Sequence, residues 1–193
     1  MTRIRAVVAA LAVLAPVALA ASAATAAPAL TVATTPEQHP VSLHADDTPV
    51  SATIPVDTSA STGTVRVMRV VVPVQAGDVL DITAEARVTN NVGYNVGVGS
   101  YLAWYDVDDG VPWPHAQPWP RIGTATGDNV NPQRHHMPIT LTRAYIVPGT
   151  WPAGHRMVIN LMVDGHSTAA QSGDALTVDP YGQMIVRRWS ATS

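Results

Sequence analysis

The chain has 193 residues, with 11 basic and 14 acidic side chains, a formal net charge of −3 and no cysteine. The acidic balance argues against binding to nucleic acid or an anionic membrane surface, since both need clustered cations. Without cysteine there can be no disulfide, thiol catalysis or thiolate metal site. We therefore expect the fold to be held by core burial alone, without a cofactor.

The first 26 residues have the pattern of a secretory signal peptide. Two arginines precede an apolar stretch of about fifteen residues, and the second of two A-x-A cleavage sites ends at Ala26. The apolar stretch is broken by Pro16 and is too short to span the roughly 30 Å core of a bilayer. We expect residues 1–26 to be cleaved and the protein to be secreted, without membrane insertion, from Ala27 onward.

Residues 27–62 are rich in proline, threonine, serine and alanine, which predicts an extended N-terminal arm. Val50, Ile54 and Val56 lie in the apolar phase of an alternating stretch. This alternation predicts an edge or added strand, because Pro55 cannot donate to neighbours on both sides. The arm is either a disordered tether or a strand that docks on another chain. In the second case, these three side chains contact the partner.

Residues 63–193 are predicted to form one β domain. A change of phase at Met68 and Arg69 indicates a bulge, and the alternating Gly97 and Gly99 predict close approach of another backbone or sheet. No apolar stripe has helical spacing. The fold class is therefore all-β, a single antiparallel β-sandwich of jelly-roll type, with an immunoglobulin-like sandwich as the alternative. The expected strands are 64–74, 80–88, 92–105, 139–147, 157–163 and a C-terminal hairpin of 175–178 with 183–189.

A long irregular insertion is predicted at residues 106–137, and it contains Pro-Trp-Pro twice. The flanking prolines stiffen the backbone around Trp113 and Trp119, with His115 between them. Rigid indoles suit stacking on sugars or hot spots of protein interfaces. Alternatively, both indoles fold back over an edge of the sandwich.

An acidic turn begins the same insertion. Asp106, Asp108 and Asp109 offer oxygen ligands of the kind that calcium prefers. The spacing does not match an EF-hand, and no bidentate glutamate follows. We therefore favour a solvated acidic turn over a calcium site.

Histidine side chains can serve as metal ligands or as catalytic bases. Adjacent histidines in an extended chain point to opposite faces, so we expect polar loop residues or interface donors rather than a zinc site. No G-x-S-x-G elbow is present, and catalysis would need a triad assembled from loops. We therefore expect a protein that is not an enzyme. The histidines concerned are His115, His135, His136, His155 and His166.

The chain resembles two groups of secreted bacterial proteins. Residues 64–189 resemble the jelly-roll modules of lectins and tail-fibre tips. The arm and body together resemble the small adaptor subunits of the umbrella toxin particles of actinobacteria, in which the adaptor joins a large toxin chain to lectin-bearing subunits. All basic residues are arginine, which is typical of a GC-rich genome such as an actinobacterial one.

The leading hypothesis is a secreted, non-catalytic subunit for protein interaction or assembly, with another secreted protein as its partner. The first alternative is a carbohydrate-binding module that holds a cell-surface glycan through Trp113 and Trp119. The second alternative is a hydrolase with a loop-built site.

Overall fold

The computed structural model describes residues 42–46, 53–59, 63–111, 119–134, 136–180 and 182–191, all within the unit Gln38–Ser193. These residues form ten strands and one short 3₁₀ helix. The strands are β1 (Ser42–Asp46), β2 (Thr53–Asp57), β3 (Val65–Pro73), β4 (Val79–Asn90), β5 (Val96–Asp106), β6 (Arg121–Val130), β7 (His136–Ile146), β8 (Arg156–His166), β9 (Ala175–Val178) and β10 (Gln183–Trp189), and η1 is Pro132–Arg134.

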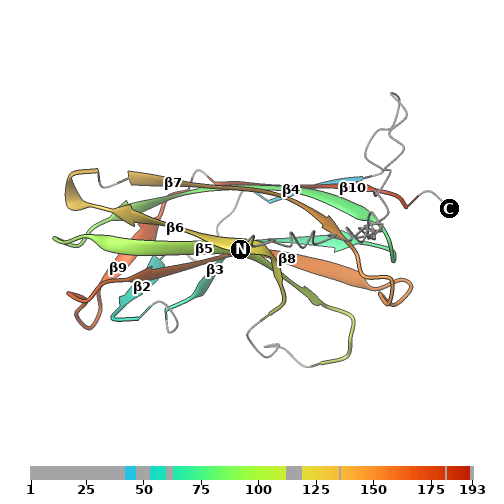
Figure 1. Cartoon of the computed structure of the whole chain (residues 1–193), viewed down its shortest axis with the longest axis horizontal. Helices are drawn as coiled ribbons and strands as arrows, with labels where there is room; N and C mark the ends of the chain where they lie inside the picture. Colours follow the sequence, from blue (N-terminus) through green and yellow to red (C-terminus); the bar gives the residue numbers. More distant parts are fainter. Residues whose placement is uncertain are drawn as a thin grey trace, which may run out of the picture. The chain divides into compact units, whose positions relative to one another are not determined.

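The strands form two layers, seen in Figure 1 as β7, β4 and β10 against β6, β5 and β8. Sheet I has the order β1-β10-β4-β7, and sheet II has the order β3-β8-β5-β6. These two four-strand orders are those of a jelly roll, in which two Greek keys interlock. The predicted all-β jelly-roll sandwich is therefore confirmed.

The core lies between the two sheets and follows from strict alternation in the sequence. Leu80, Ile82 and Val88 of β4 are fully buried and Ala84 and Ala86 face inward with them, while Asp81, Thr83, Glu85 and Arg87 face outward. From the opposite sheet, Ile159 and Leu161 of β8 pack into the same cluster. In the described residues, no helix has the length and apolarity that a membrane span requires.

Strands β1 and β2 lie in the segment expected to be an arm. β1 pairs with β10, and β2 pairs antiparallel with β9 and parallel with β8, so β2 links the two sheets. Ile54 and Val56 are buried in the core. The alternation therefore indicated a strand correctly, but this strand completes the protein's own sandwich. Its inward side chains are not available to another chain.

Two other expectations differ from the structure. Residues 121–130 lie inside the expected irregular insertion but form β6, whose composition contains few apolar residues. β9 and β10 do not form the expected hairpin, because both pair with the same edge of β4, one after the other. Asp179 lies between them and accepts hydrogen bonds from Arg87 Nε at 2.5 Å and Thr89 Oγ1 at 2.8 Å.

β3 contains a bulge, which lies just before the position predicted for it at Met68 and Arg69. The register shifts between Arg66 and Met68, so that Val67 and Met68 are both buried.

Candidate functional site

The outer face of sheet II is the candidate site. Side chains alternate along a strand, so the residues of β8 that lie between core positions point away from the core. On an ordinary antiparallel sandwich such residues face water. Of five outward residues of this strand, the first four are buried and alternate between apolar and polar character. They are Val158, Asn160, Met162, Asp164 and His166.

One transverse row of this face runs across all four strands. In register, Arg69 of β3 lies beside Asn160 of β8, which lies beside Ala103 of β5, which lies beside Arg121 of β6. Two cations thus bracket an amide and a methyl group. The neighbouring rows on β5 carry much larger side chains.

Three aromatic rings pack on this face. Tyr105 and Trp119 lie with ring centroids 5.1 Å apart, and the guanidinium of Arg66 is 6.0 Å from the centroid of Trp119. The guanidinium of Arg121 lies 4.2 Å from the centroid of Tyr101. All three rings are buried, and burial raises the pKa of Tyr105. The rings are therefore engaged by one another and by arginine.

Asn160 stands out among the polar groups of the face. It has no exposed surface, and neither its side-chain oxygen nor its nitrogen has a hydrogen-bond partner. A buried polar group without a partner destabilises a fold by about 1–3 kcal/mol. Such a group in a native structure needs an explanation beyond packing.

Asp164 and His166 lie at the other end of β8, above two glycines of β5. A Cβ at Gly99 would lie 2.5 Å from the Asp164 carboxylate, and a Cβ at Gly97 would lie 2.6 Å from the His166 ring. The close approach expected at these glycines is therefore made by side chains of the paired strand. Asp164 Oδ1 and His166 Nδ1 are 3.6 Å apart, and burial raises the pKa of Asp164.

Arg69 and Arg121 are exposed, and neither forms an ion pair in the described part of the chain. Burial raises the pKa of Asp164, and Arg121 is near enough to that carboxyl to oppose the shift. Elsewhere, ion pairs join Arg87 to Asp179, Arg156 to Asp108, Arg187 to Asp81 and Arg188 to Asp78. Arg143 donates to the carbonyl groups of Thr142 and Thr124.

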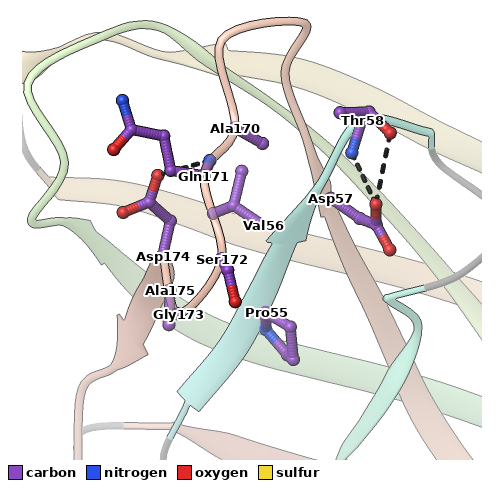
Figure 2. Close-up of a pocket in the computed structure, with 10 residues that line it drawn as sticks. All are labelled: Pro55, Val56, Asp57, Thr58, Ala170, Gln171, Ser172, Gly173, Asp174 and Ala175. Carbon is purple, nitrogen blue, oxygen red and sulfur yellow. Dashed lines mark hydrogen bonds between the residues drawn. The ribbon is translucent and has the colours of Figure 1, made fainter.

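A pocket of about 460 Å³ lies elsewhere, where the end of β2 meets the loop before β9. Figure 2 shows the carboxylates of Asp57 and Asp174 on either side of Val56. Both carboxylates are already engaged. Asp57 accepts the Thr58 N–H at 2.7 Å, and Asp174 accepts the Gln171 N–H at 2.9 Å.

The Tyr94 hydroxyl also donates to Asp174 and lowers the pKa of that carboxyl. The remaining walls are small residues and backbone, so the pocket offers no converging set of donors for a particular ligand.

The acidic turn is built from contacts within the protein. Asp106 Oδ2 lies 2.8 Å from His155 Nδ1. Asp108 accepts the backbone N–H of Arg156 at 2.8 Å and the guanidinium Nη2 at 2.6 Å. These hydrogen bonds lower the pKa of Asp108 to about 2. Among the described residues, no three metal-ligating side chains form a group.

On sheet I, Thr89, His136 and Asp179 bring a hydroxyl, an imidazole and a carboxylate together, but not in the arrangement of a catalytic triad. His136 Nδ1 lies 2.8 Å from Thr89 Oγ1 and 3.5 Å from Asp179 Oδ2. In a nucleophile–base–acid triad, the two ring nitrogens face different partners. Here the same nitrogen is nearest to both.

The predicted site residues have different outcomes. Val50, Trp113 and His115 lie outside the described residues, as does His135 of the histidine set. Ile54 and Val56 belong to the core. Trp119 packs against Tyr105 on the outer face of sheet II. Because Trp113 lies outside the described residues, the alternative that both indoles cover an edge of the sandwich stays a prediction.

The sequence analysis missed Asn160, Arg69 and Arg121. The available signal was a polar Asn160 within the otherwise apolar stretch Met157–Val163, which alternation alone assigns to the solvent face.

Comparisons with known proteins show likenesses of fold at low identity. A chain of the infectious bursal disease virus Gx strain structure is 13% identical, with a TM-score of 0.47, and the match covers 77% of this chain and 33% of the viral chain. The Eiger TNF from S. frugiperda is 9% identical, with a TM-score of 0.43 and coverage of 80% and 96%. A CBM4 structure is 11% identical, with a TM-score of 0.26 and coverage of 78% and 92%.

This chain thus spans about a third of the viral chain. No family model and no curated protein matches it. The jelly-roll assignment rests on the strand order of the chain itself.

Proposed function

We propose that this protein is a secreted, non-catalytic interaction subunit that binds another secreted protein through the outer face of sheet II. The observation that carries the proposal is the packed cluster of aromatic rings and arginine on this face, which the exposed Arg69 and Val71 border.

The composition of the face supports a protein partner. Tryptophan, tyrosine and arginine are the residue types enriched at the energetic centres of protein interfaces. On this face, Trp119 and the two tyrosines form a packed cluster with arginine. Exposed residues, among them Arg69 and Val71, border this cluster.

A glycan partner is less well supported. Sugar recognition uses an aromatic ring with a free face for stacking. Arg121 lies over Tyr101, and Trp119 lies against Tyr105. These contacts leave little ring surface on which a sugar could stack. A protein partner can instead contact the exposed arginines.

Such a subunit would act in an extracellular assembly, as the resemblance to umbrella-toxin adaptors implies. The signal-peptide pattern of residues 1–26 supports secretion, and the cleaved chain would then meet its partner outside the cell.

Site-specific photo-crosslinking tests the proposal. A photo-reactive amino acid replaces Val71 on the outer face of sheet II or, as the matched control, Ile146 on the outer face of sheet I. These side chains are exposed to similar extents, 37% and 47%. The full chain is produced in a GC-rich actinobacterial host and recovered from the medium.

We expect a discrete adduct with a second protein from Val71 and none from Ile146. Equal adducts from both positions, or none from Val71, would contradict the proposed face. Retention of the chain inside the cells would contradict secretion. Binding on a glycan array that is lost in Trp119→Ala would favour the carbohydrate alternative.

A further inference from the structure

We infer that Arg143 closes the open edge of the sandwich against the addition of a strand from a second copy of this chain. The open edge is the side on which β6 ends sheet II and β7 ends sheet I (Figure 1). In the described residues, β6 pairs with β5 alone and β7 pairs with β4 alone. The inference concerns this edge and does not depend on the proposed function.

The free edge of β7 presents backbone groups that another strand could bond. The carbonyl of Arg87 in β4 accepts the N–H of Asp179, which lies on the side of β4 away from β7. Backbone groups alternate in direction along a strand, so every second residue of β7, from Pro138 to Ile146, directs its backbone away from β4. A long unpaired edge of this kind pairs readily with another chain unless something blocks it.

Arg143 interrupts the apolar pattern on the inner side of β7. Its register partner is Ile82, a core residue, so Arg143 belongs to the inward phase of the strand. Leu141, the inward residue before it, is buried, whereas Arg143 is half-buried. An inward-pointing charge on an edge strand is one of the features by which β-sheet proteins avoid edge-to-edge association.

The guanidinium of Arg143 joins the two edge strands. Its Nη1 donates to the carbonyl of Thr142 at 2.8 Å, and its Nη2 donates to the carbonyl of Thr124 in β6 at 3.2 Å. The Thr142 carbonyl is one of the groups that face the free edge. A strand that adds to β7 would need this carbonyl and would have to displace the side chain. Hydrogen bonds from a charged donor resist that displacement more strongly than neutral ones.

β6 is shaped to receive this side chain. A Cβ at Gly123 would lie 2.7 Å from Arg143 Nε, and the φ of this glycine is 74°. The register of β6 against β5 shifts at this point, between Ser100 and Leu102, so β6 bulges where Arg143 meets it. A bulge also disrupts pairing at a sheet edge. Both strands therefore contribute to closing the gap.

The mass of the purified full chain in solution tests the inference, measured by light scattering from micromolar to millimolar protein. We expect the original chain to stay monomeric. Arg143→Ala should form a species of twice the mass, because it frees the Thr142 carbonyl and removes the charge from the edge. Arg187→Ala is the matched control, since it removes an arginine from the outer face of sheet I, and should stay monomeric.

A second substitution locates the association. Thr140 is exposed and directs its N–H toward the free edge, so proline there removes a donor that only an added strand would use. Arg143→Ala combined with Thr140→Pro should therefore return to the monomer mass. In the Arg143→Ala dimer, the N–H groups of Thr140 and Ala144 should exchange with deuterium at least about tenfold more slowly than in the original chain.

Arg143→Gln provides a second variant if Arg143→Ala does not fold, and circular dichroism verifies each fold. Glutamine is too short to reach both carbonyls, so this variant should dimerise as well. Folded but monomeric Arg143 variants would overturn the inference. A dimer that persists with Thr140→Pro, or equal association of Arg187→Ala, would also overturn it, because either result places the contact on another surface. So would an original chain that already dimerises through this edge.

Discussion

The two outer faces of this sandwich are built from the same kind of strand but differ in character. On sheet I, the outward residues of β4 and β7 are mostly threonine, charged residues and proline, with the apolar Val79, Ala144 and Ile146 toward one end, and all are exposed or half-buried. Some of its charges are paired, for example Asp81 with Arg187 at 3.3 Å. On sheet II, the outward residues of β5 and β8 include tyrosine, methionine and an unpaired asparagine, most of them buried.

The comparison shows how the outer face of sheet II differs from an ordinary solvated face. A solvated face needs only polar side chains that balance one another, and sheet I has them. The outer face of sheet II instead combines packed aromatics with polar groups that lack partners. Proteins depart from local rules of this kind mainly at functional sites.

Replacing one tryptophan on each side of the sandwich should give the largest difference in the free energy of unfolding. Trp119 is buried against Tyr105, so Trp119→Ala leaves a cavity and should lower the free energy of unfolding by about 3 kcal/mol. Trp189, half-buried at the end of β10, should lose less than about 1 kcal/mol on the same change. Urea titration measures both, and equal losses would show that the two faces pack alike.

The next largest loss of stability is expected when a methyl group is added at a glycine. In Gly99→Ala, the new Cβ would lie 2.5 Å from the buried Asp164 carboxylate, so we expect a loss of about 2 kcal/mol. Gly149→Ala meets open space and should change stability by less than about 0.5 kcal/mol. Thermal unfolding of the pair suffices, and a neutral Gly99→Ala would mean that Asp164 moves freely.

The smallest predicted effect is the pH dependence of two carboxylates. Burial raises the pKa of Asp164, so the native state holds its proton more tightly and this group's contribution to stability is lost as pH rises. Asp164→Asn should therefore stabilise the protein at pH 7, with a gain that shrinks toward pH 4. The gain at pH 7 should be smaller than the loss expected for Gly99→Ala.

Asp179 should show the opposite dependence of stability on pH. Burial raises its pKa, but hydrogen bonds from Thr89 and Arg87 outweigh burial and the net pKa is lowered. Its contribution is present at neutral pH and lost as pH falls through the folded pKa, so Asp179→Asn should destabilise at pH 7 by an amount that shrinks in acid. Unfolding curves at pH 4 and 7 with the same sign for both variants would refute this reading.

The sequence predicted the fold where alternation was regular. The strand at 80–88 shows inward and outward phases clearly, and it lies at the centre of sheet I as β4. β6 was not predicted because Arg121–Val130 contains two glycines, an aspartate and an asparagine, residue types depleted in strands, and it forms a strand through pairing with β5. Such pairing is a tertiary effect that a local pattern does not contain.

The candidate site was harder to predict for a similar reason. Trp119 was recognised from its flanking prolines, but its neighbours Tyr105 and Arg66 come from other strands. The row from Arg69 to Arg121 exists only through the register of four strands that are distant in the sequence. Long-range register cannot be read from the spacing of residues along one segment.

The most direct test of the central claim is photo-crosslinking from Val71 on the outer face of sheet II and from Ile146 on the outer face of sheet I, two side chains that are exposed to similar extents. The account predicts a discrete adduct with a second protein from Val71 and none from Ile146. Equal adducts from both positions, or none from Val71, would contradict the claim that the outer face of sheet II binds a protein.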